Sequence, residues 1–280
     1  MKIIAVSDVH LGSEDSNKSE FDTFLNSLID DQEVTDLVLL GDIVEMWRRD
    51  ASGVFLENMD TVQIIKDLQR KIKVHCVAGN HDYHLLKMKN RAPYYNYPFE
   101  FNENLELQDG DRTYRFMHGY EFEYGNELAL MEPIMELLCH IMTDAEGVSE
   151  DKLWVYLARK ITDLQYTILT HTINKEDLNK RVRKLSDSPK VRLKDKLLDI
   201  ERRAYAEVQD NAVLVFGHTH HPFINDEENL VNTGSWVNDS IPHNTYLEIL
   251  DGVPRLFVYG GKEIKERQKT EKVAPSPEIH

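Results

Sequence analysis

Apolar runs and helical periodicity alternate along the first part of the chain. Residues 2–6 and 37–40 are near-continuous apolar runs, and residues 73–78 form a third candidate strand after a stretch of helical spacing. Runs of this kind are typical of strands that are buried on both faces of a sheet. The order strand, helix, strand therefore predicts an α/β fold with parallel strands.

Two Asp-Gly pairs predict antiparallel hairpins further along the chain. They stand between residues 105–108 and 113–117 and between residues 246–250 and 255–259. Asp-Gly between two strand-like segments is a strong local signal for a tight hairpin turn. Another apolar run occupies residues 212–216, so we expect the C-terminal part to complete the sheet structure.

The interval between these two parts has helical periodicity and no strand signal. Apolar residues recur at steps of three and four over residues 128–142 and 153–168, and Ser188-Pro189 marks the start of a third helix. Beyond Gly261 the chain is almost entirely polar. The pattern therefore predicts a core, a helical insertion that acts as a cap or lid, and a mobile polar tail, at residues 1–119 with 212–261, 120–211 and 262–280.

The composition is that of a folded protein with an acidic surface. Of 280 residues, 41% are hydrophobic and 29% are charged, and the formal net charge is -16. An acidic field repels polyanions, so we expect nucleic acid not to be a partner. The chain has only two cysteines and no apolar stretch of about 18 residues. We therefore expect a cytoplasmic protein without a disulfide framework or a membrane span.

One basic segment departs from this acidic balance. Residues 175–203 contain eleven Lys or Arg against six Asp or Glu. One interpretation is a solvated helix face with ion pairs along the helix. The other is a basic lid that gathers an anionic substrate or makes transient contact with membrane phosphate, which would place the protein at the membrane periphery.

Candidate metal ligands follow the predicted strands one after another. An isolated Asp-x-His is typical of a loop pair with a capping role. Here, however, five predicted strands each lead into Asp, His or Asn residues. The motifs are Asp8-Val9-His10, Gly41-Asp42, Gly79-Asn80-His81-Asp82, His118-Gly119 and Gly217-His218-Thr219-His220. Open α/β sheets assemble their sites at this edge, so we expect these residues to form one site.

The order of these motifs resembles that of the calcineurin-like metallophosphoesterase superfamily, up to about Gly261 with the insertion interrupting it. The resemblance implies a four-layer α/β/β/α sandwich that binds two divalent metal ions. It assigns Asp8, His10 and His220 to one ion, Asn80, His118 and His218 to the other, and Asp42 to a bridge between them. Carboxylate, amide and imidazole ligands without thiolate suit Mn(II), our first choice, and also Fe(II) or Zn(II).

The chemistry that the resemblance implies is metal-dependent hydrolysis of a phosphoric ester. Two cations would hold a hydroxide between them and grip the phosphoryl oxygens for in-line attack. His81 would stabilise or protonate the leaving oxygen, and Asp82 could orient the His81 imidazole. Further candidates for substrate contacts are Arg48, Arg49, His84 and His221, although Arg48 and Arg49 also suit a solvated basic loop.

Three functions follow from this interpretation. The first is a phosphodiesterase, phosphatase or pyrophosphatase that acts on a phosphorylated small molecule. The second is cleavage of a lipid-linked UDP-sugar at a membrane surface. The helical insertion after His118 and the tryptophan near Gly41-Asp42 resemble the UDP-2,3-diacylglucosamine hydrolase type, although this chain has His81 where that type commonly has Arg. The third is a non-catalytic scaffold on the same fold, which a complete set of ligands argues against.

Overall fold

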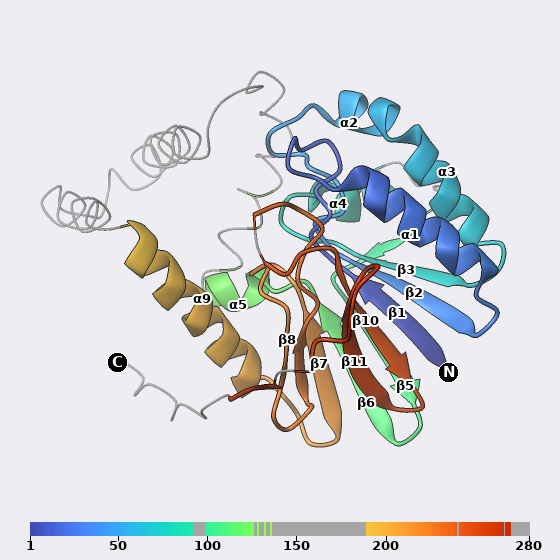
Figure 1. Ribbon diagram of the computed structural model, residues 1–280. Coiled ribbons are helices and arrows are strands. Elements are labelled where there is room, and N and C mark those ends of the chain that lie inside the picture. Colours follow the sequence, from blue (N-terminus) through green and yellow to red (C-terminus); the bar gives the residue numbers. More distant parts are fainter. Residues whose placement is uncertain are drawn as a thin grey trace, which may run out of the picture. The chain divides into compact units, whose positions relative to one another are not determined.

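The computed structural model describes residues 1–91, 99–125, 128, 132, 135, 189–239, 241–265 and 267–269. The chain divides into two compact units, and one of them comprises Met1–Asp144 together with Asp199–His280. The other comprises Ala145–Leu198. All the strands described here belong to the first unit (Figure 1).

The first sheet has six strands and contains both of the predicted parallel pairs. Its parallel strands are β1 (Lys2–Val6), β2 (Val34–Leu40), β3 (Lys73–Val77) and β4 (Phe101–Asn102). The predicted hairpin at the C-terminal Asp-Gly pair is confirmed as β10 (Thr245–Leu250) and β11 (Val253–Val258). Strand β10 pairs antiparallel with β1, which gives the order β11-β10-β1-β2-β3-β4.

The second sheet also has six strands and mixes both orientations. The other predicted hairpin is confirmed as β5 (Asn104–Asp109) and β6 (Arg112–Met117). Strand β6 pairs parallel with β7 (Ala212–Phe216), which brings a second set of strand ends that carry candidate ligands to the same edge. The sheet continues through β9 (Leu230–Asn232), β8 (Phe223–Asn225) and β12 (Arg267–Gln268).

Helices flank both sheets. In Figure 1, α1 (Lys18–Asp30), α2 (Ala51–Glu57) and α3 (Met59–Leu68) lie together on one side of β1, β2 and β3. The remaining helices are α4 (His84–Arg91), α5 (Tyr120–Tyr124) and α9 (Pro189–Ala206). The last of these was predicted at Ser188-Pro189 and is confirmed. Its residues Ile200, Ala204 and Tyr205 pack with Phe216 and Leu230 against the second sheet.

The main core lies between the two sheets. Ile3, Val38 and Leu247 of the first sheet are buried in one cluster with Tyr114 and Val213 of the second. Two mixed sheets that pack face to face, with helices outside them, form the predicted α/β/β/α sandwich. Burying strand residues on both faces explains why β1 and the end of β2 are continuous apolar runs.

The polar tail begins later than the sequence predicted. Ile264 packs against the main core, and Arg267–Gln268 pair in parallel with β8. Residues 262–265 and 267–269 are therefore part of the fold, and the expectation of a mobile tail from residue 262 was wrong for them. A two-residue strand is held by backbone hydrogen bonds, which leave no apolar pattern in the sequence.

Most of the predicted insertion lies outside the described residues. This holds for the helices expected at residues 128–142 and 153–168 and for most of the basic segment. The boundaries of the core and the insertion therefore stay predictions. Among the described helices, none is both long and apolar enough to cross a bilayer.

Candidate metal centre

The candidate ligands lie at the carboxyl ends of strands from both sheets. Asp8 and His10 follow β1, Asp42 follows β2, and Asn80 follows β3. In the second sheet, His118 follows β6 directly, and His218 and His220 follow β7. The structure thus places all seven at the strand ends that the sequence indicated.

The backbone at this edge is held in an unusual conformation. Nine described non-glycine residues have a positive φ, and five of them are candidate ligands. These five are Asp8, His10, Asp42, His218 and His220, with φ between 48° and 65°. The left-handed region costs non-glycine residues about 1 kcal/mol or more, and such strain gathers at functional sites. The fold therefore maintains this geometry against a local preference.

Three glycines leave no room for a side chain beside the ligands. A Cβ added to Gly41 would collide with the His118 ring, and one added to Gly217 would collide with Ser7 and Asp8. A Cβ on Gly79 would collide with the Asp42 carboxylate and would lie 2.5 Å from the Asp42 backbone nitrogen. The glycines of the Gly-Asp, Gly-Asn and Gly-His motifs thus permit the close approach of strands that carry ligands.

Replacing Gly79 with Ala is expected to lower kcat/KM about 10²-fold with little change in secondary structure. The added methyl must push Asp42 aside, and a displacement near 1 Å in a catalytic group has an effect of about this size. Steady-state kinetics and circular dichroism would measure both effects. Gly261→Ala is the control, because its methyl would meet only Val258, at 3.3 Å. Wild-type kinetics in Gly79→Ala would refute the steric argument.

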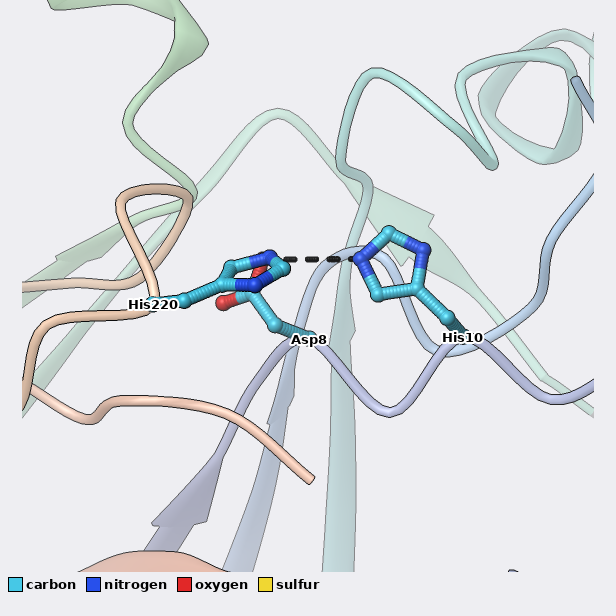
Figure 2. Close-up of side chains that lie close together, drawn as sticks. All are labelled: Asp8, His10 and His220. Atoms are coloured by element: carbon cyan, nitrogen blue, oxygen red, sulfur yellow. Dashed lines mark ion pairs between the residues drawn. The ribbon is translucent and has the colours of Figure 1, made fainter. Parts of the chain in front are cut away.

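The first group of candidate ligands is Asp8, His10 and His220, whose nearest ligand atoms all lie within 4.8 Å of one another. Asp8 Oδ1 is 3.3 Å from His220 Nε2 and 4.0 Å from His10 Nε2. Figure 2 shows the His10 ring facing the Asp8 carboxylate and the His220 ring, which overlap in this view. This is the set that the resemblance assigned to one ion.

The second group is Asp42, His118 and His218, again within 4.8 Å. Asp42 Oδ2 lies 3.1 Å from His118 Nε2 and 3.8 Å from His10 Nε2. It is therefore close to a histidine of each group, as a bridging carboxylate must be. Asn80 is buried, with 3% of its surface exposed, and its backbone neighbour His81 donates to Asp42 Oδ1 at 2.8 Å.

Four buried atoms in these groups have no hydrogen-bond partner. They are Asp8 Oδ1, His10 Nε2, Asn80 Oδ1 and His118 Nε2. Leaving a buried polar group unpaired costs about 1–3 kcal/mol, so such groups are rare unless something else binds them. Carboxylate and amide oxygens with imidazole nitrogens are suitable ligands for divalent cations. The residues present therefore fit the expected metal ions.

The second ring nitrogen of each candidate histidine is held by an oxygen. His10 Nδ1 is 3.2 Å from Glu45, His118 Nδ1 is 2.8 Å from the Leu40 carbonyl, and His220 Nδ1 is 2.6 Å from Asp239. His218 differs, because its Nε2 is 2.6 Å from Glu123. Such partners fix the tautomer and ring orientation of histidines that bind metal. With these partners in place, the ring nitrogens that could bind a cation are Nε2 of His10, His118 and His220, and Nδ1 of His218.

Sequence analysis missed the three carboxylates in this set. Glu45 stands three residues after Asp42, so a Gly-Asp-x-x-Glu pattern could have indicated it. Glu123 and Asp239 lie outside every motif, and no local signal marks them. Their role depends on contacts with His218 and His220 that only the tertiary structure creates.

His81 lies beside the two ligand groups and is held by Glu45. Its Nδ1 is 2.9 Å from both Glu45 oxygens, and its ring stacks on Trp47 with centroids 4.2 Å apart. The expectation that Asp82 orients His81 was wrong. Asp82 instead accepts from the Ile43 and Gly79 backbone N–H groups, at 2.8 Å and 2.6 Å. At this turn, the side chain of Asp82 points into the gap between the loops that follow β2 and β3.

A family model for calcineurin-like phosphoesterases matches residues 1–222 of the chain. The chain belongs to this family. No curated protein matches the chain. The match covers all the candidate ligands, including the last one, His220.

Solved structures of phosphoesterases are similar to this family member at low identity. A novel archaeal phosphodiesterase has 13% identity and a TM-score of 0.42, with 92% of this chain and 99% of that chain covered. A dimetal phosphatase from Danio rerio has 12% identity and a TM-score of 0.40, with the same coverage. A predicted phosphoesterase from Streptococcus pneumoniae has 13% identity and a TM-score of 0.38, with 95% and 94% covered. The family membership stands on the family model.

Charges in the centre of this calcineurin-like phosphoesterase are strongly coupled. Burial disfavours the charged form of His118, but Asp42 and Asp8 outweigh it and raise the pKa of His118 to about 10. Burial likewise opposes the charge on His220, while Asp8 and Asp239 raise its pKa to about 10. Without a cation, protons on these imidazoles balance the buried carboxylates. A metal ion would take over that role and displace them.

The pKa of the loop carboxylate Asp82 is also raised, which in a carboxyl group favours the neutral form. Burial and the nearby Asp42 raise the pKa of Asp82 to about 6. Burial also opposes the charge on His81, but Glu45 and Asp42 raise the pKa of His81 above its usual value. The protonated, donating form of His81 therefore persists to a higher pH than it would in an exposed histidine.

The four candidate substrate contacts have different surroundings. Arg49 donates to the Gly12 carbonyl at 3.0 Å and pairs with Glu57 at 2.5 Å, contacts that fix its loop. His221 pairs with Glu201 at 3.0 Å. Arg48 is close enough to His81 to act against its protonation, and His84 begins α4. Their roles in substrate binding stay predictions.

Proposed function

We propose that this calcineurin-like phosphoesterase hydrolyses a phosphodiester, phosphomonoester or pyrophosphate bond with the help of two divalent cations, of which Mn(II) is our first choice. The observation that carries the proposal is the set of four buried ligand atoms that make no hydrogen bond, in two groups that both approach Asp42. A cation in each group would satisfy these atoms. A non-catalytic scaffold would have no need to maintain them.

The proposed assignment follows the two groups of ligands. Asp8, His10 and His220 would hold one cation, and Asn80, His118 and His218 would hold the other. Asp42 would be shared, which is supported by its distances to His10 and His118. Two such cations would supply an activated water and would neutralise charge on the phosphoryl oxygens.

The chain itself would supply a donor for the leaving oxygen. His81 is positioned by Glu45 through Nδ1 and by stacking on the Trp47 ring. An imidazole whose pKa is raised by a buried carboxylate keeps its proton to a higher pH than an exposed histidine does, and it can give that proton to an alkoxide. Asp82 would hold the loops after β2 and β3 together, so that Asp42 and Asn80 keep their separation.

Removing divalent cations is expected to abolish hydrolysis, and adding Mn(II) is expected to restore it. Protein treated with a chelator would be assayed on a chromogenic phosphodiester before and after Mn(II) is added. A cation that binds only the folded state also stabilises it, by about 2.7 kcal/mol at 100 times its Kd, so the unfolding midpoint should rise. Full turnover in protein shown by elemental analysis to be free of metal would refute the proposal.

A substrate panel with Mn(II) would select among the phosphoric esters. The arms are monoesters, diesters, cyclic nucleotides, UDP-sugars and an acylated UDP-sugar presented in anionic vesicles. Preference for the last arm, with sedimentation on the vesicles, would support the lipid-linked pyrophosphatase and a transient membrane contact. Preference for a soluble ester would support a cytoplasmic enzyme acting on a small molecule. No turnover in any arm by protein loaded with two cations would favour the scaffold.

A further inference from the structure

Two carboxylates contact histidines of one loop, and in sequence they stand on either side of residues 126–188. Glu123 of α5 is 2.6 Å from His218 Nε2, and Glu201 of α9 is 3.0 Å from His221 Nδ1. Both histidines belong to the loop that follows β7. Both carboxylates are largely buried, with exposed side-chain fractions of 14% for Glu123 and 3% for Glu201.

The contact with Glu123 decides which way the His218 ring faces. His218 has a positive φ of 65°, and its backbone N–H donates to Asp8 Oδ2 at 2.9 Å, which places the backbone. These restraints place the backbone and do not by themselves set the rotation of the ring about its side-chain bonds. Because Nε2 is bonded to Glu123, Nδ1 is the atom available to the group of Asp42 and His118.

Helix α5, which carries Glu123, depends on α9 for its position. It has five residues, and a helix of that length is not stable alone. Arg203 of α9 donates to the carbonyls of Phe122 and Glu123, at 3.3 Å and 3.5 Å. Phe122 is buried in the same cluster as Ile200 of α9. The end of α9 therefore fixes α5, and α5 fixes the carboxylate.

We propose that Glu123 is a positioning residue that holds His218 in the tautomer and orientation needed to bind the second cation. The inference rests on the proposed function, because it requires His218 to be a metal ligand. A carboxylate behind a metal-binding imidazole fixes its orientation and increases its basicity, and losing such a partner typically lowers metal affinity 10–100-fold. The first cation has separate support, from Glu45 behind His10 and Asp239 behind His220.

Titration with Mn(II) separates the two half-sites without relying on turnover. Wild-type protein is expected to bind two ions by calorimetry and to show the electron paramagnetic resonance of a coupled pair. Glu123→Ala should bind one ion with unchanged affinity and the other about 10–100-fold more weakly, with the signal of an isolated ion at limiting Mn(II). Glu123→Gln keeps the shape and should have a smaller effect in the same direction.

Double variants identify the half-site that is affected. If Glu123 and Asn80 support the same ion, Glu123→Ala with Asn80→Ala should still bind one ion tightly. Glu123→Ala with Asp239→Asn should weaken both ions, because Asp239 supports the other half-site. Arg203→Ala should reproduce a weaker form of the Glu123→Ala effect. The controls are Glu207→Gln and Arg202→Ala, both at exposed positions.

Two outcomes would overturn the inference. One is binding of both ions with wild-type affinity by Glu123→Ala that is folded by circular dichroism. The other is a double variant with Asn80→Ala that loses the remaining ion, since Glu123 would then act elsewhere. Failure of the proposed function has a different signature. Wild-type protein that binds two ions and hydrolyses no phosphoric ester would refute the enzyme while the positioning role stands.

Discussion

Replacing Asp42 with Asn is expected to lower kcat/KM about 10³-fold or more while the protein stays folded. Asp42 Oδ2 lies near His118 in one ligand group and near His10 in the other, so its charge serves both proposed cations. Charge stabilisation by metal ions is worth several kcal/mol in such reactions, and about 4 kcal/mol corresponds to 10³-fold in rate. Steady-state kinetics on the preferred ester and elemental analysis of bound metal would measure the effect.

The substitution to Asn is chosen because it keeps the shape of the side chain. The amide oxygen can still accept from the His81 backbone N–H, a bond that the carboxylate makes at 2.8 Å. The change therefore removes charge with little loss of packing. Asp226→Asn is the control, because Asp226 is an exposed carboxylate away from the ligand groups. Activity within tenfold of wild type in Asp42→Asn would contradict the shared position of Asp42.

The ligand positions could be predicted because their signals are local. Each candidate follows an apolar run, and parallel strands bring their carboxyl ends to one edge. The partners behind the histidines could not be predicted in this way. Glu123 and His218 are 95 residues apart in sequence, and no local pattern in either segment indicates that they are in contact. Asp82 shows the reverse error, since the residue that follows His81 in sequence does not bond to its imidazole but to the Ile43 and Gly79 backbone N–H groups.

The long strands and the hairpins of the fold could be predicted from the sequence, and the short strands could not. Strands β1 and β7 are continuous apolar runs because both of their faces are buried, and the two Asp-Gly pairs mark hairpins. Strands β4, β8, β9 and β12 have two or three residues each, too few for any periodicity to be visible. The left-handed backbone at Asp8 and at the other ligands could not be predicted either, because an aspartate or a histidine does not indicate a positive φ as a glycine does.

Replacing Glu45 is expected to have two large effects that different substitutions separate. Glu45 is completely buried and accepts from the Trp47 and Arg48 backbone N–H groups, at 2.9 Å and 3.1 Å, as well as contacting His10 and His81. Glu45→Ala leaves these groups without their acceptor. Breaking a buried charged network costs about 3–5 kcal/mol, which a urea unfolding curve would measure. Glu106→Ala, at an exposed carboxylate, is the control.

Glu45→Gln can keep the backbone hydrogen bonds but loses the charge that faces both histidines. We expect kcat to fall about 10²–10⁴-fold, the usual contribution of a general acid, because His81 then loses the carboxylate that orients it and favours its protonated form. The direction in which the pH profile should move follows from two opposing effects on the pKa of His81. Burial lowers the pKa of His81, and Glu45 raises it. Without Glu45 the imidazole loses its proton at a lower pH, so the alkaline limb of the kcat profile should move toward acid. An alkaline limb that stays in place in Glu45→Gln would mean that another group donates the proton, because the charge of Glu45 cannot be removed without changing the ionisation of His81.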